Sequence, residues 1–193
     1  MATDPQVGPL SEENQRASKT ITLVAAGVLL VGAVVFILES DSWYPAFKTV
    51  HVVSALLWIG GGAFLTFMAM AIERSDNPGR LIEVARQAEW GATRIFVPAS
   101  FVVLGMGIAM TINGDLDWGQ FWLVFGLIAW AISTVIGVGF LTPRIKTLNS
   151  LIDERGERDL AVQAAVRPIL LAARLDIALL LLIVVDMTVK PSF

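Results

Sequence analysis

Residues 47–72 read FKTVHVVSALLWIGGGAFLTFMAMAI, and this run decides the fold. It is longer than the roughly 20 apolar residues that a helix needs to cross the ~30 Å hydrocarbon core of a bilayer. Its lysine, Lys48, and its histidine, His51, both lie near its N-terminal end. The run therefore predicts a transmembrane helix with a polar beginning.

Four further runs have the same character, at residues 21–38, 96–112, 121–141 and 169–189. With 55% hydrophobic residues, the chain carries far more apolar sequence in long runs than a soluble domain does. The alternation that a barrel requires is absent, and an open sheet edge would leave backbone donors unsatisfied in lipid. The sequence predicts an all-α membrane protein with five transmembrane helices.

Composition divides the chain into three parts. Residues 1–18 are polar and acidic, and we expect a flexible cytoplasmic tail there rather than a signal peptide. Residues 19–40 are expected to form an additional transmembrane helix. Residues 45–191 are expected to form a four-helix membrane bundle with cytoplasmic amphipathic connections, of which residues 79–94 lead directly into the next span.

Proline and glycine predict where the later helices end. We expect Pro143 to end the fourth span, and Gly156 to separate two short charged helices in the connection that follows. Pro168 suits the first turn of the fifth span.

The charge distribution predicts the orientation. Of 14 lysines and arginines, only Lys48 and Lys190 fall on one side of the threaded bundle, which leaves 14 − 2 = 12 on the other. The positive-inside rule then places the N-terminus in the cytoplasm and the C-terminus outside. We expect a multi-pass protein of the bacterial inner membrane, in contact with the lipid bilayer, with subunits of a membrane complex as candidate partners and no nucleic acid.

The chain has no cysteine, which excludes disulfides, covalent haem attachment, iron–sulfur clusters and thiolate metal sites. His51 is the only histidine, so few side chains are left for chemistry, and we expect no enzymatic activity. Trp58 falls on the same helical face as His51, together with small residues that would let a neighbouring helix or a flat cofactor approach.

Met110, Asp186 and Met187 fall at a similar depth to His51 in the threaded bundle. Met106 and Met110 lie four residues apart in the outer half of the third span, and Met187 lies one turn before the end of the fifth. An imidazole with a thioether is a sound axial pair for haem iron, and an imidazole with several thioethers suits Cu(I). The alternative is that these methionines only fill gaps in the core and that His51 is wetted by headgroups.

The two outer cations, Lys48 and Lys190, are candidate partners for haem propionates. The alternative is that they are anchors that extend to the membrane surface. In the fifth span, Arg174 and Asp176 are costly in hydrocarbon, and we expect them to pair within the bundle, with Arg94 or Glu89 as candidate partners. The apolar run 177–185 offers no proton relay outward from Asp176, which argues against a pump or a proton-coupled transporter.

The segment from His51 to Gly62, in which Trp58-Ile59-Gly60-Gly61 begins seven residues after the histidine, resembles a helix of a group of small bacterial membrane proteins. The group includes copper resistance protein D, the membrane-bound haem-type protoporphyrinogen oxidase and a predicted integral membrane family of unknown function. The resemblance is strongest to the last, over residues 45–191. Residues 63–70, AFLTFMAM, depart from the oxidase pattern.

The resemblance implies a four-helix core in which His51 binds b-type haem or, as in the copper family, assists metal uptake. Our leading hypothesis is therefore a haem b or electron-transfer membrane subunit with its site near the outer face. A copper-handling membrane protein that uses the same His and Met side chains is the alternative. A ligand-free accessory subunit of a larger complex, with no cofactor at all, is the third.

Overall fold

The computed structural model describes residues 24, 35, 42–73, 79–156 and 158–191. The expected tail over residues 1–18 lies outside them, and so does nearly all of the additional helix expected within 19–40, so both stay predictions. Residues 46–193 form one compact unit.

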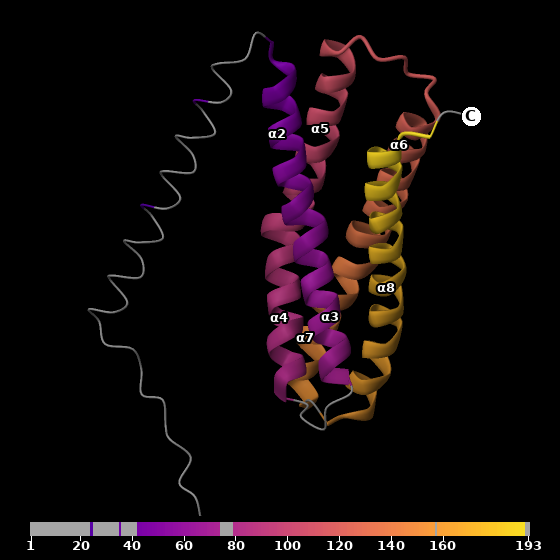
Figure 1. The fold of residues 1–193 in the computed structure, drawn as a ribbon. Coiled ribbons are helices and arrows are strands. Elements are labelled where there is room, and N and C mark those ends of the chain that lie inside the picture. The colour runs from indigo at the N-terminus through magenta and orange to yellow at the C-terminus, as the bar shows by residue number, and fades with distance from the viewer. Residues whose placement is uncertain (1–23, 25–34, 36–41, 74–78, 157, 192–193) are drawn as a thin grey trace, which may run out of the picture. The chain divides into compact units, whose positions relative to one another are not determined.

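Four helical rods make up the bundle, and each is long and apolar enough to span a membrane: Tyr44–Glu73, Glu83–Asn113, Phe121–Arg155 and Leu160–Val189. The described part of the chain contains no strand. The predictions of an all-α fold and of four helices able to span a membrane are thus confirmed for the described residues. In Figure 1 the helical elements, in chain order, are α2 (Tyr44–Ala55), η1 (Leu56–Gly60), α3 (Gly61–Glu73), α4 (Gly79–Gly91), η2 (Ala92–Phe96), α5 (Val97–Asn113), α6 (Phe121–Thr134), η3 (Val135–Leu141), α7 (Thr142–Arg155) and α8 (Leu160–Val189).

The first three rods each contain a π-helical segment, η1, η2 or η3, between two α-helices. A π-helix widens the turn so that backbone bonds run between residues five apart. At the end of η3, for example, both the backbone N–H and the side-chain hydroxyl of Thr142 donate to the carbonyl of Gly137. Such segments are rare and frequent at functional sites. Here they mark the middle of the bundle.

The rods pack through three clusters of buried side chains. One joins α4, α7 and α8 through Ala85, Leu148 and Val162, and a second joins η1, α5 and α8 around Trp58 and Leu180. The third joins α3, α4 and α8. Large apolar side chains on the outer faces stay exposed, as lipid contact requires. We call the end with the α5–α6 turn and Trp122 the aromatic end, and the end with Glu73, Arg86 and Asp153 the charged end.

The prediction for Pro143 is wrong. The third rod continues unbroken through it to Arg155, because Pro143 falls at the junction of η3 and α7, where the missing N–H interrupts a turn that is already widened. The break at Gly156 is confirmed, since its φ of 79° ends α7.

The prediction for Pro168 is also wrong, because it lies inside α8, which already begins at Leu160. The carboxylate of Asp159 caps that beginning by accepting a 2.7 Å hydrogen bond from Ala161 N–H. The cap and the alanine-rich first turns allow the helix to start well before the proline.

Candidate functional site

A cavity of about 160 Å³ lies inside the bundle. All four rods line it, and each π-helical segment contributes to its wall: η1 through Trp58, η2 through Phe96 and η3 through Gly137. Its walls are mostly apolar, and it reaches toward the charged end through Ala85 and Leu148. The polar side chains that line it are those of Thr66, Ser100, Ser133, Thr134, Thr142 and Asp176.

Three of these polar side chains carry a buried atom without a hydrogen-bond partner within the described residues. They are Asp176 on α8 and Ser133 and Thr134 on α6, and the unpaired atoms are Asp176 Oδ1, Ser133 Oγ and Thr134 Oγ1. The Asp176 side chain is only 8% exposed. The Ser133 hydroxyl lies near this carboxylate, but no hydrogen bond of good geometry joins them. Unpaired buried polar atoms of this kind are rare and costly, so they call for an explanation.

The other hydroxyls in the cavity are satisfied by their own helices. Thr66 donates to the carbonyl of Gly62 at 2.9 Å, and Ser100 donates to the carbonyl of Val97 at 2.8 Å. The hydroxyl protons of Thr66 and Ser100 are therefore already used and need no ligand as a partner. Asp176, Ser133 and Thr134 form the polar site of the cavity.

The pairing within the bundle that was expected for Arg174 is confirmed, although with neither candidate partner, whereas the pairing expected for Asp176 is wrong. The Arg174 guanidinium forms its ion pair with Glu73 on α3, at the charged end. Glu89 accepts a hydrogen bond from Asn149 instead. No lysine or arginine lies among the residues that line the cavity. Asp176 is therefore a buried carboxylate without a cation from the described part of the chain.

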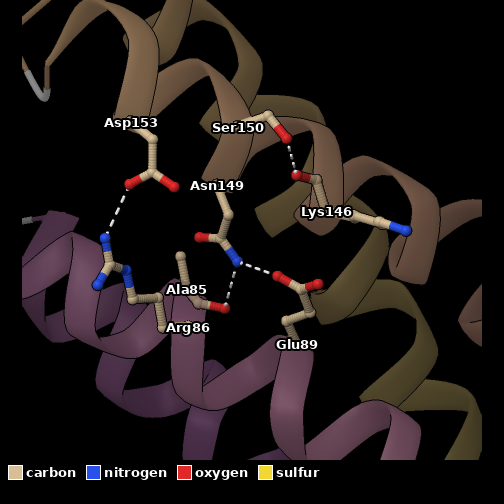
Figure 2. A network of polar contacts seen from close by, with 7 residues as sticks. All are labelled: Ala85, Arg86, Glu89, Lys146, Asn149, Ser150 and Asp153. Carbon is tan, nitrogen blue, oxygen red and sulfur yellow. Dashed lines mark hydrogen bonds and ion pairs between the residues drawn. The ribbon is translucent and has the colours of Figure 1, made fainter.

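At the charged end, α4 and α7 are joined by the polar contacts that Figure 2 shows. Asn149, which is buried, donates through Nδ2 to Glu89 Oε2 at 2.5 Å and to the Ala85 carbonyl at 3.4 Å. Arg86 and Asp153 form a 2.8 Å ion pair nearby. Because Ala85 also lines the cavity, this network borders the part of the cavity nearest the charged end.

His51 lies between α2 and α5, toward the aromatic end. Its Nδ1 is 2.8 Å from the carbonyl oxygen of Val103, and its Cε1 would lie 3.3 Å from a Cβ added at Gly107. The carbonyl can only accept, so this geometry assigns the proton to Nδ1 and leaves Nε2 with its lone pair. An imidazole oriented in this way is prepared to act as a ligand.

The structure places the other predicted site residues in more than one interface. The methyl group of Met187 packs against Gly126 on α6, whereas His51 contacts α5. Met110 lies one turn beyond Gly107 on α5, and Met106 lies on the same helix. Equal depth, which grouped these residues in the sequence, does not put Met187 on the surface that faces His51.

The remaining predicted residues have clear surroundings. Trp58 is buried in the core and lines the cavity. Lys48 is exposed, and the Lys190 ammonium lies 4.7 Å from the centroid of the Trp122 ring, a cation–π contact. Among the described residues, no group of three or more His, Asp or Glu side chains is placed to hold a metal ion.

Sequence reasoning singled out Asp176 but gave it a partner, and it passed over Ser133 and Thr134. The signal that could have found the site is a pair of adjacent hydroxyls in one predicted span together with a carboxylate in another. Which of them meet depends on helix rotation, and rotation is altered by the π-helical segments.

Comparison with known proteins identifies the family. Residues 45–191 match the family described as "Predicted integral membrane protein (DUF2269)". The chain belongs to this family. The wider relation to copper resistance protein D and the haem-type oxidase stays a prediction.

Two curated relatives are similar to this member of the family. They are the arginine exporter protein ArgO of Shigella flexneri and that of Escherichia coli O157:H7, each 31% identical over 149 residues. The match covers 69% of this chain but 64% of each exporter, so the chain spans less than two thirds of their length. No solved structure matches the chain significantly.

Proposed function

We propose that this membrane protein transports a small solute and that the cavity holding Asp176, Ser133 and Thr134 is the solute's binding site. The observation that carries the proposal is the set of unpaired polar atoms in an otherwise apolar cavity inside a membrane bundle. Small-molecule sites have this composition, with apolar walls and a few polar groups that fix orientation.

The irregular helix geometry at the cavity wall supports a functional role for the cavity. All three π-helical segments contribute wall residues, and irregular helix at membrane depth is tolerated where it lines a cavity. π-Helical turns within α-helices are frequent at functional sites. The apolar run 177–185 offers no proton relay from Asp176 to Asp186. We therefore propose transport of a solute without proton transfer along α8.

The similarity to arginine exporters supports the same class of activity and suggests an amino acid or a related small molecule as the solute. The cavity extends toward the charged end, which the positive-inside rule assigns to the cytoplasm. A solute would then load from inside, as export requires.

Filling the cavity tests the proposal. Gly137 lines the cavity, and a Cβ there meets nothing within 4 Å, so Gly137→Leu should insert bulk without disturbing the wall. We expect Gly137→Leu to reduce efflux of labelled L-arginine from proteoliposomes at least tenfold. Gly139→Leu is the matched control, because Gly139 is exposed, lies in the same segment and does not line the cavity. Equal efflux from wild type, Gly137→Leu and empty vesicles would refute transport of this solute.

His51 favours a second candidate, a b-type haem or electron-transfer subunit. Its Nδ1 contact with the Val103 carbonyl orients the ring and leaves Nε2 for iron. Met110, one turn beyond Gly107, is then the nearest candidate for the second axial position by register, and Lys48 and Lys190 are candidates for the propionates. A bound haem would supply one-electron redox chemistry.

Spectra and metal analysis test this second candidate. The purified, dithionite-reduced protein should show α and Soret bands that His51→Ala abolishes. Copper without porphyrin would favour the copper-handling alternative, in which His51, Met106, Met110 and Met187 are the ligands. Neither bands nor copper in the wild type would leave the accessory-subunit alternative for this part of the molecule.

A further inference from the structure

We infer that the cavity selects an organic monocation, an ammonium or guanidinium on an apolar body, and that the Asp176 carboxylate is the group that recognises its charge. This inference rests on the proposed function, because it takes the cavity to be a binding site. It goes beyond that function because it names the chemical class of the solute and the residue that binds the solute's charged group.

The residues that line the cavity carry one acidic side chain and no basic one. Asp176 is the one acidic side chain in the lining, and no basic side chain lines the cavity to neutralise it. The nearest arginine in sequence, Arg174, is already paired with Glu73. The described part of the chain therefore presents a single negative charge to the cavity without a countercharge.

The energy of burial then points to a ligand. An ionised carboxylate in apolar surroundings is expensive unless it is paired or hydrogen-bonded, and Asp176 Oδ1 is neither. Polar residues inside membrane helices are functional candidates for this reason. A bound cation would supply the missing partner, and the unpaired oxygens of Ser133 and Thr134 can accept further N–H groups from it.

The walls decide which kind of cation fits. Hard divalent ions need six or more oxygen ligands, several of them usually carboxylates, whereas this cavity offers one carboxylate. The rest of the surface near Asp176 is formed by apolar side chains such as Ile177, Leu180 and Trp58. An aliphatic body with one cationic head matches both parts of the surface.

A comparison of charged and neutral isosteres tests the inference on the full-length protein in nanodiscs. The probes are n-butylguanidinium against n-butylurea, and L-arginine against L-citrulline, with binding measured by calorimetry. We expect each cation to bind at least tenfold more tightly than its neutral partner. Asp176→Asn should remove that preference, whereas Asp176→Glu should keep most of it.

Asp186→Asn is the matched control, because Asp186 is also a buried carboxylate on α8 with an unpaired oxygen but lies outside the cavity. It should keep the preference for cations. Equal binding of cation and urea by the wild type, binding of no probe at all, or displacement of the cations by millimolar sodium would each overturn the inference.

The two proposals fail in different ways. Tight binding of the cations without any efflux from proteoliposomes would overturn transport and leave the inference standing. Efflux of citrulline as fast as arginine would overturn the inference and leave transport standing. The wild-type comparison does not depend on any variant folding correctly.

Discussion

At the residue scale, Gly107 shows how closely α2 and α5 approach at His51. An added Cβ would lie 3.3 Å from Cε1 of the ring, whose Nδ1 is bound by the carbonyl of Val103, one turn earlier on the same helix. Gly105, two residues earlier on the same helix, has nothing within 4 Å of its Cβ position. Two glycines with the same local geometry thus face very different surroundings.

Alanine at each of the two positions should therefore change stability by different amounts. Gly105→Ala should raise the free energy of unfolding by about 0.5–1 kcal/mol, because alanine is the better helix former. Gly107→Ala should lose this gain through contact with the ring and come out about 1 kcal/mol below Gly105→Ala. Thermal unfolding in detergent measures both. Equal gains at the two positions would show that the His51 ring is free to move.

At the element scale, the apolar runs located the rods well. The run 47–72 lies inside the rod Tyr44–Glu73, and 121–141 begins with the rod Phe121–Arg155. The ends were missed where helices continue into water, since hydropathy marks contact with lipid and not the end of the helix. The π-helical segments were missed because their composition does not differ from that of an α-helix. Each π-helical segment rotates the residues that follow it about the helix axis. The residues that face a neighbouring helix could therefore not be derived from the regular α-helical period of 3.6 residues.

The contact between α4 and α7 yields a prediction in which burial separates two polar contacts. Asn149 is 8% exposed and binds both Glu89 and the Ala85 carbonyl, whereas the Arg86–Asp153 pair is more than half exposed. We expect Asn149→Ala to cost about 1–3 kcal/mol and Arg86→Ala less than about 1 kcal/mol. Chemical unfolding monitored by tryptophan fluorescence compares them.

Ser150→Ala is the control, because the Ser150 hydroxyl is exposed and bonds only within its own helix, to the Lys146 carbonyl. It should change stability by no more than about 0.5 kcal/mol. A loss of stability in Arg86→Ala as large as that in Asn149→Ala would mean that the surface ion pair stabilises the contact between α4 and α7 as much as the buried amide does.

At the scale of the whole molecule, threading by charge predicted which residues share an end, but not which helices meet. It placed His51 and Met187 in one leaflet, yet the first contacts α5 and the second α6. It assumed that Asp176 had a partner, because the cost of an unpaired charge is the usual argument for pairing. An unpaired carboxylate is indeed costly to bury, and the proposed selectivity depends on this unpaired Asp176 carboxylate oxygen.

The orientation itself remains a prediction, and it decides the direction of transport. Among the described residues, Lys48 and Lys190 are the only lysines or arginines at the aromatic end, so the charged end should face the cytoplasm. Because the chain has no cysteine, single substitutions give specific labels. Asn113→Cys lies exposed at the aromatic end and Ser150→Cys lies exposed at the charged end. A membrane-impermeant maleimide should label Asn113→Cys in right-side-out vesicles and Ser150→Cys only in inverted ones. The reverse pattern would place the charged end, toward which the cavity extends, outside the cell, and the same carboxylate would then serve uptake of a cation rather than its export.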